Sequence, residues 1–130
     1  MDCKRAWEEA GGDFEKAVAL IHERGIAKAA KKSERSTGAG IVASYIHGDR
    51  LGVLVDLRCE TDFVARADEF RQLAREIAMQ IAAMNPSSVN ELMGQPYIKD
   101  ESNTMETLVK RVIAKVGENI KVDRFSRYEI

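Results

Sequence analysis

The residues best suited to chemistry lie in one short stretch, residues 59–66, which reads Cys-Glu-Thr-Asp-Phe-Val-Ala-Arg. Glu60 and Asp62 stand two residues apart, and paired carboxylates can act as a general acid and a general base when their environments separate their pKa values. Nothing in the sequence argues that this pair is buried, so acid–base catalysis is the weaker interpretation. Phe63 is the unusual residue, because a large aromatic at a junction between two elements either packs into the core or contacts a partner.

The remaining sequence contains no recognisable catalytic set. Two cysteines far apart and two histidines provide none of the spacings typical of zinc sites. No serine, cysteine or aspartate can be identified as a partner for His47, which we interpret as an exposed residue beside a turn. Gly38 and Gly40 are not followed by the Gly-Lys-Ser/Thr of a phosphate-binding loop. We therefore expect a protein that acts by binding, not an enzyme, and we expect no metal and no cofactor.

The composition is that of one ordinary folded domain or a small core with an appendage. Of 130 residues, 45% are hydrophobic and 32% are charged, which is typical of a globular chain. The net charge of -1 gives no overall basic field that would attract nucleic acid or an anionic membrane. No apolar run approaches the roughly 20 residues that span a bilayer, and the first residues lack a secretory signal. We expect a cytoplasmic protein of bacterial type with reduced thiols, and leave an organellar location open.

The first 36 residues are predicted to form a helical module. Apolar residues recur at helical spacing over 2–10 and 13–24, and Gly11-Gly12 separates the two segments. Gly25 is predicted to end the second helix, because glycine readily adopts the left-handed conformation of a C-terminal cap. The hairpin has too little apolar surface to be stable alone, so we expect another part of the chain to cover it.

A third, short helix is predicted over 26–32, and Lys28, Lys31 and Lys32 make it basic. We interpret these lysines as exposed linker residues, and a patch that binds phosphate or acidic groups is the alternative. Polar residues and glycines follow over 33–40, which is the one clear change in composition along the chain. The predicted units are residues 1–36, the helical module with its basic linker helix, and residues 37–130, the core.

The second unit contains the clearest strand pattern. Apolar and polar residues alternate over 51–59, which predicts a strand with one buried face. A short turn separates this strand from a β-branched segment at 41–47, so we expect an antiparallel hairpin. A third strand is predicted over 120–129, where the alternation slips between Val122 and Phe125 and indicates a bulge or a short edge pairing. The place of this third strand in the sheet stays open.

Two longer helices are predicted, because apolar residues recur at helical spacing over 68–84 and 105–116. The expected helix caps and stops are, in chain order, Asp68, Asn85-Pro86, Asn103 or Thr104, and Gly117. Between the helices, 87–94 is interpreted as a connector and 95–98 as an extended segment. The expected fold class is α+β: an N-terminal helical hairpin followed by a three-stranded antiparallel sheet packed on helices.

Residues 57–66, together with Phe70, resemble the signature of the elongation factor Ts family. The resemblance extends over nearly the whole chain, and the combination of segments is much more specific than any one of them. The other similar segments are residues 1–6 and 9–13 (MDCKRA and EAGGD), 28–32 (KAAKK), 52–55 (GVLV), 95–100 (QPYIKD) and 113–120 (IAKVGENI).

The chain also departs from the family pattern. Members normally begin with another helix and a Thr-Gly-Ala-Gly loop, so the resemblance implies that the hairpin here is an incomplete ubiquitin-associated-like module. Family members also carry a longer helical section between the positions of Asn85-Pro86 and Gln95-Pro96. Only a short connector stands there in this chain, so we expect a short form of the family.

The resemblance implies a guanine-nucleotide exchange factor for elongation factor Tu. In the family, the Asp-Phe pair of the signature contacts the nucleotide-binding domain of that partner, which corresponds to Asp62 and Phe63 here. The ring of Phe63 would be the wedge, and Asp62 would orient the contact. Thr61 and Val64, on either side of this pair, belong to the expected binding site.

The resemblance places a second contact at the N-terminus, where Met1 and Lys4 match positions that touch the partner. The expected partner is elongation factor Tu, GDP-bound or nucleotide-free, with no direct contact to nucleic acid or membrane, and a homodimer is left open. The alternative function is a module without exchange activity that binds nucleic acid or a ubiquitin-like protein.

Whether Phe63 points inward or outward is open from the pattern of residues alone. The buried face of the preceding strand runs through Leu57 and Cys59, and this alternation favours inward packing. The resemblance implies the opposite, so we expect Phe63 to be substantially exposed.

Overall fold

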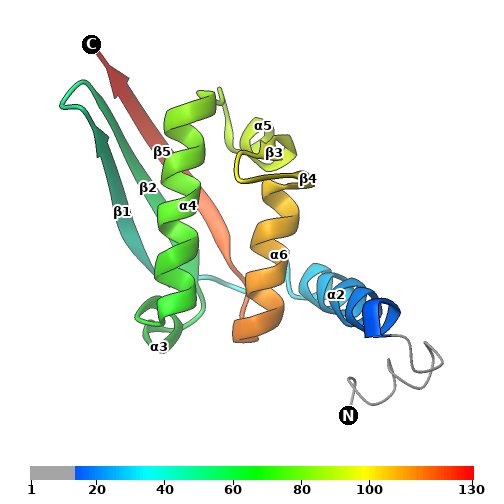
Figure 1. Cartoon of the computed structure of the whole chain (residues 1–130). Helices are drawn as coiled ribbons and strands as arrows, with labels where there is room; N and C mark the ends of the chain where they lie inside the picture. Colours follow the sequence, from blue (N-terminus) through cyan, green and yellow to red (C-terminus); the bar gives the residue numbers. More distant parts are fainter. Residues whose placement is uncertain (1–13) are drawn as a thin grey trace.

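The structure is a computed structural model that describes residues 14–130. It is an α+β fold, in which a three-stranded antiparallel sheet is packed on helices (Figure 1). The predicted helix at 2–10 and its stop at Gly11-Gly12 lie outside the described residues. The elements in chain order are α2 (Phe14–Lys31), β1 (Ala39–His47), β2 (Leu51–Cys59), α3 (Asp62–Ala65), α4 (Asp68–Met84), α5 (Val89–Gly94), β3 (Pro96–Tyr97), β4 (Asp100–Thr104), α6 (Met105–Val116) and β5 (Lys121–Glu129).

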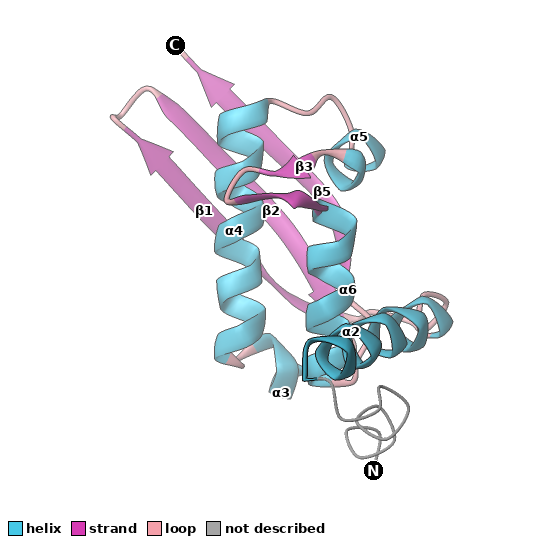
Figure 2. Ribbon diagram, turned by 45° about the vertical axis from the view of Figure 1, so that its right-hand side comes forward, coloured by secondary structure: helices cyan, strands magenta, loops and turns pink. Residues whose placement is uncertain are grey.

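The sheet has the order β1-β2-β5, so the predicted hairpin supplies its edge and its centre. Antiparallel pairing of β1 with β2 runs from Ala39 opposite Cys59 to His47 opposite Leu51. The third strand, whose place the sequence left open, pairs with the other side of β2. Its predicted bulge is confirmed, because the register shifts by one residue at Asp123. β2 is therefore paired along both edges (Figure 2).

The core lies between the sheet and the helices that cover one of its faces. Of the alternating residues of β2 predicted to face inward, Leu51 is half-buried and the other four, Val53, Val55, Leu57 and Cys59, are buried. Helix α4 lies across β1 and β2. The apolar stripe of α4 completes this layer, as its helical spacing predicts. The largest fully buried side chains here are Phe70, Leu57, Ile77, Ile81, Leu92 and Met105.

The ends of the two longer helices follow the predictions at three of four positions. Asn85, with a left-handed φ of 44°, ends α4, and Gly117, with a φ of 78°, ends α6. Thr104 caps α6, since its hydroxyl accepts a hydrogen bond from the Thr107 N–H at 3.2 Å. The prediction for Asp68 is wrong: the cap position is Ala67, and Asp68 is the first helical residue. At that position its carboxylate interacts favourably with the positive end of the helix dipole, but it does not form a cap.

The predicted stop at Gly25 is wrong, because α2 continues through it to Lys31 and includes the segment predicted as a separate helix. Gly25 lies where α2 packs on α6. A Cβ added to it would lie 3.1 Å from the Cβ of Ala114, closer than an ordinary contact. Glycine within a helix costs about 1 kcal/mol in conformational entropy, and at this position the close approach of two helices offsets that cost. The same residue type therefore serves packing here and capping at Gly117.

The interpretation of 87–94 as a connector is also wrong, since it contains α5. Ser88 caps this helix by accepting a hydrogen bond from the Glu91 N–H at 3.1 Å, and Leu92 fixes it to the core with no exposed surface. The extended segment predicted at 95–98 contains β3, which pairs with β4 in a small second sheet.

The small β3–β4 hairpin is attached to α4 through Glu76. The Glu76 carboxylate accepts hydrogen bonds from Tyr97 Oη at 2.7 Å, Lys99 Nζ at 2.8 Å and Gln72 Nε2 at 2.7 Å. Burial raises the pKa of Glu76, but these three donors outweigh it and hold the pKa below its usual range. Burial of the phenol raises the pKa of Tyr97, and the Glu76 carboxylate raises it further.

This arrangement predicts a pH-dependent stability. Because the pKa of Glu76 is lower in the folded state than its ordinary 4.5, its contribution is complete above that pH and is lost as the pH falls through the folded-state value. Glu76→Gln should lower the free energy of unfolding at pH 7 by about 1–3 kcal/mol, with a smaller difference from the wild type at pH 3.

Urea denaturation at both pH values measures the effect. Glu101→Gln, which changes an exposed carboxylate of the same hairpin, is the matched control and should leave the stability unchanged at pH 7. An equal loss at pH 7 and pH 3 for the Glu76 variant would contradict the assignment.

Gly40 provides a steric prediction for the start of the sheet. A Cβ at this position would lie 2.3 Å from the carbonyl oxygen of Leu57 and 2.9 Å from the Cα of Arg58, so the backbone of β2 would have to move. Gly40→Ala should lower the free energy of unfolding by about 2–3 kcal/mol. Gly38→Ala is the control, since no atom lies within 4 Å of its added Cβ; equal stabilities of the two variants would disprove the steric argument.

Candidate functional site

The signature residues form a single helical turn at the end of the central strand. β2 ends at Cys59, and α3 begins three residues later. Thr61 is its cap: the hydroxyl oxygen accepts a hydrogen bond from the Val64 N–H at 3.4 Å, and the Thr61 carbonyl accepts one from Ala65. This turn lies at one end of the molecule, below α4, as Figure 1 shows.

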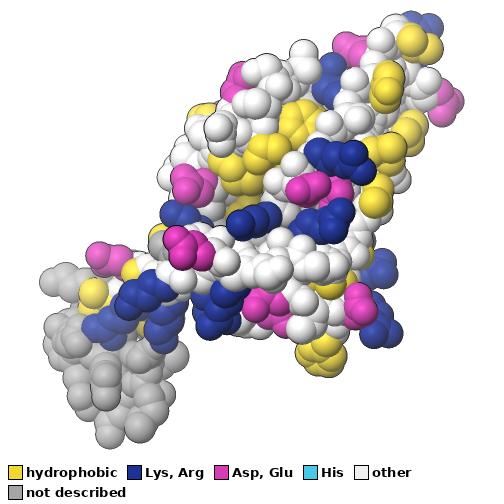
Figure 3. Space-filling view, turned by 180° about the vertical axis from the view of Figure 1, so that it is seen from behind, with side chains coloured by type: hydrophobic (Ala, Val, Ile, Leu, Met, Phe, Trp, Pro, Cys, Tyr) yellow, Lys and Arg dark blue, Asp and Glu magenta, His cyan; other side chains and the backbone are white. Residues whose placement is uncertain are grey.

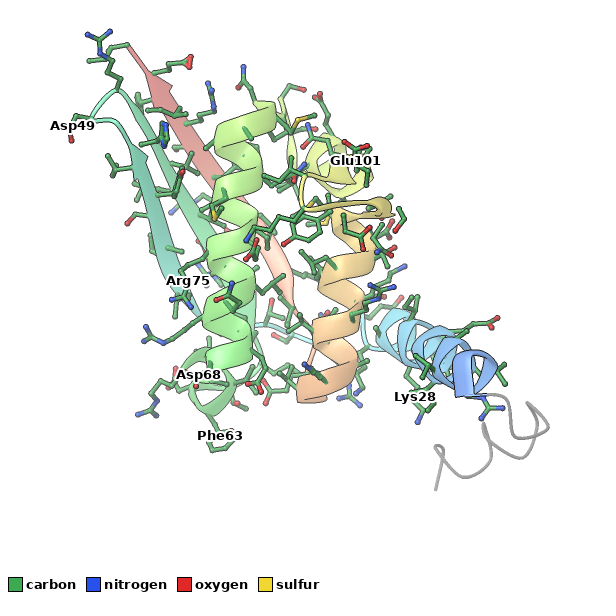
Figure 4. All side chains as sticks on the ribbon, in the orientation of Figure 1. Lys28, Asp49, Phe63, Asp68, Arg75 and Glu101 are labelled. Carbon is green, nitrogen blue, oxygen red and sulfur yellow. The ribbon has the colours of Figure 1, made fainter. Side chains whose placement is uncertain are left out.

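The turn presents two opposite faces. Val64 and Ala65 are 5% and 4% exposed and belong to the core, whereas Phe63 is 83% exposed. Figure 4 shows the ring of Phe63 pointing away from the body of the protein. The expected exposure of Phe63 is confirmed. The inward packing favoured by strand alternation is wrong because alternation stops at Cys59, and the helical turn directs Val64 and Ala65 inward instead.

The backbone before Phe63 is held by Glu118, which follows α6. Its Oε1 accepts hydrogen bonds from the N–H groups of Glu60 at 3.1 Å and Thr61 at 3.0 Å, and its Oε2 accepts one from the Thr61 hydroxyl at 2.7 Å. The segment 113–120 signalled its importance only through its resemblance to the family. Its contact with the signature, 57 residues away in the chain, was missed.

Glu60 and Asp62, the pair considered for acid–base catalysis, lie in different environments. The carboxylate of Glu60 accepts a hydrogen bond from the Asn119 N–H at 2.6 Å and lies 3.8 Å from Arg35 Nη1, while Asp62 is exposed. Cys59 is buried, and burial, with the nearby charge of Glu118, raises the pKa of its thiol. A neutral thiol that donates to the Thr61 carbonyl at 3.2 Å is a poor nucleophile.

Two other common features, a metal site and a membrane-spanning helix, are not found in the described part of residues 14–130. Among the side chains that the structure describes, no group of three or more His, Cys, Asp or Glu could hold a metal ion. No helix within the same range is both long enough and apolar enough to cross a membrane. His47 is exposed, as predicted, with its Nδ1 3.2 Å from the Tyr45 hydroxyl.

The two remaining groups of sequence candidates have different outcomes. Met1 and Lys4 lie outside the described residues. Lys28 and Lys31 are exposed in the last turn of α2 and Lys32 is half-buried. Basic side chains gather over this part of the surface in Figure 3.

The fold and this site define a small α+β protein that presents an exposed aromatic on a turn anchored in the core. Comparison with known proteins gives the family. The model described as elongation factor TS matches residues 60–130. The chain belongs to the elongation factor Ts family, and it is therefore a translation elongation factor.

Individual relatives match the whole chain. Elongation factor Ts of Thermosipho melanesiensis is 41% identical over 100% of this chain and 90% of that protein. Elongation factor Ts of Thermodesulfovibrio yellowstonii is 38% identical, over 100% of this chain and 87% of the relative. Elongation factor Ts of Synechococcus is 43% identical over 98% of this chain but only 62% of the relative.

The alignments also show that this chain is shorter inside the matched region. The alignment with the Thermosipho protein spans 176 positions, against 130 residues here. The relative therefore has residues within that region for which this chain has no counterpart.

Proposed function

We propose that this chain is a guanine-nucleotide exchange factor that binds elongation factor Tu and promotes GDP release without covalent chemistry. One observation carries the proposal: Phe63 is 83% exposed although the residues next to it, Val64 and Ala65, are buried. An isolated exposed aromatic held on a rigid turn is the kind of residue that dominates binding energy at protein interfaces. Membership of the elongation factor Ts family supports the choice of partner.

In the proposed mechanism, the factor displaces the groups of the partner that bind the nucleotide. A rigid aromatic buries a large apolar area with little loss of conformational entropy. If the ring of Phe63 enters the nucleotide-binding domain, a shift of about 1 Å in the backbone that binds phosphate and magnesium weakens several charge-assisted hydrogen bonds to GDP. By linkage, GDP then weakens the binding of the factor to the same extent. Exchange follows because each ligand promotes the release of the other.

The residues near Phe63 have different roles in this proposal. Asp62, exposed beside Phe63, orients the contact. Thr61, which is exposed, caps the turn and lies beside the contact, whereas Val64 is buried and anchors the turn in the core. Residues 1–36 are proposed as a separate, ubiquitin-associated-like module, in which Met1 and Lys4 provide a second contact with the partner.

Phe63→Ala should slow factor-stimulated release of GDP from elongation factor Tu by about tenfold or more, as expected for an interface hot spot of roughly 2 kcal/mol. Because Phe63 is exposed, the free energy of unfolding should change by less than about 0.5 kcal/mol. Release of a fluorescent GDP analogue, followed by stopped flow, measures the rate.

Tyr128→Ala is the control for this experiment. It also removes a highly exposed aromatic, but on the open face of the sheet, away from α3, and it should leave the rate of GDP release unchanged. A well-folded Phe63→Ala variant that stimulates release as fast as the wild type would reject the exchange mechanism.

We also propose a homodimer formed through the face of the sheet that is turned away from α4. Apolar side chains lie along this face in Figure 3, and Val42, Ile46, Leu54 and Tyr128 are each more than half exposed. Exposed apolar patches of this kind mark interaction surfaces. A second copy is the occupant that fits, because two such faces can stack as a β-sandwich about 10 Å apart.

The charges on this face also suit self-association. Asp56 lies 2.6 Å from Arg58 and 3.7 Å from Arg124, so ion pairs within each copy partly neutralise the charges on this face. Sedimentation velocity should show a dimer at micromolar concentration. Leu54→Glu should dissociate it, and Met84→Glu, at an exposed position on α4, should not. A wild-type protein that sediments only as a monomer would disprove the dimer.

A further inference from the structure

The segment that follows α6 joins three parts of the chain that are distant in sequence. Gly117 ends the helix with a φ of 78°, a conformation that glycine adopts without strain, and the chain then turns toward the end of β2. Glu118 and Asn119 follow at once. Glu118 contacts the turn before Phe63, and Asn119 contacts both that turn and the linker after α2.

The Glu118 carboxylate is the acceptor for backbone groups that the sheet does not pair. The paired residues of β2 end at Cys59, so the N–H groups of Glu60 and Thr61 lie beyond the ladder. Both donate to Oε1 of Glu118, and the Thr61 hydroxyl donates to Oε2. One carboxylate therefore fixes two consecutive peptide groups and the cap of the turn that carries Phe63.

Asn119 closes a second set of contacts around the same turn. Its side chain is 1% exposed, and its Nδ2 donates to the carbonyl oxygens of Arg35 at 2.8 Å and Ser33 at 3.3 Å. Its backbone N–H donates to Oε2 of Glu60, the atom that also pairs with Arg35. The linker, the signature turn and the end of α6 are thereby held in one hydrogen-bonded arrangement.

We infer that Glu118 is a positioning residue for Phe63, which holds the signature turn in the orientation that engages the partner, and that Asn119 supports it by fixing Glu60. This inference rests on the proposed exchange function and names two residues that act in it without touching the partner. A binding residue must be held within about 0.5 Å of its productive position by the residues behind it. The buried contacts of Val64 and Ala65 fix one side of the turn, and Glu118 fixes the backbone that leads into it.

The test uses the full-length chain and two independent measurements. In the first, amide hydrogen exchange followed by NMR reports the N–H groups of Glu60 and Thr61, without any partner present. Glu118→Ala should increase their exchange rates at least about tenfold, because each loses its hydrogen-bond acceptor. Glu106→Ala, which removes an exposed carboxylate from the first turn of α6, should leave these rates unchanged.

The second measurement is a double-mutant cycle on the rate of stimulated GDP release. Glu118→Ala alone should lower this rate about tenfold, and Glu118→Gln, which keeps one acceptor oxygen, should lower it less. In the background of Phe63→Ala, the change at Glu118 should have little further effect, because both variants then lack the same contact.

The outcomes separate the inference from the function on which it rests. Equal losses from Glu118→Ala in the wild-type and Phe63→Ala backgrounds would show that Glu118 acts elsewhere, and unchanged amide exchange would show that it does not hold the turn. If Phe63→Ala alone has no effect on GDP release, the proposed exchange function fails, whereas the amide exchange still reports the positioning. If Glu118→Ala does not fold, Glu118→Gln serves in both measurements.

Discussion

The packing of β2 between two paired strands and under α4 is the constraint on which the rest of the structure depends. Four of its five inward residues are buried, and both of its edges are paired. Such a strand can neither slip in register nor rotate without exposing its whole apolar face. Since α3 follows β2 after only two residues, the most constrained strand of the fold determines the position of Phe63. A flexible loop at this place would lose that precision.

Much of the fold could be predicted from local patterns, because burial on one face imposes a period on the sequence. The alternation in β2, the helical spacing in α4 and the slip between Val122 and Phe125 each have a structural counterpart. The errors came where the meaning of a residue depends on a distant one. Gly25 serves close packing and not capping because Ala114 lies opposite it, and no local pattern reveals that neighbour. The short α5 held by Leu92 was missed because six residues show too little periodicity.

The candidate site was predictable in a different way. Strand alternation could not give the direction of Phe63, because the period changes from strand to helix after Cys59, and the family resemblance supplied the exposed orientation that the structure has. The partners of the signature within the chain were beyond both approaches. Glu118 is a common surface residue type, and its three hydrogen bonds to residues 60–61 arise only when the end of α6 meets the end of β2.

The arrangement of the turn separates binding from stability at adjacent positions. An exposed phenyl ring contributes little to folding, whereas removing a buried aliphatic side chain such as Val64 leaves a cavity and costs the fold directly. Phe63 can therefore be selected for its fit to a partner without compromise in the core, and Val64 can be selected for the core alone. Glu118 serves neither partner binding, as Phe63 does, nor core packing, as Val64 does. Its carboxylate connects the end of α6 to the backbone of residues 60–61, which the sheet does not pair. This physical division explains how a small domain can keep one exposed aromatic in a fixed direction.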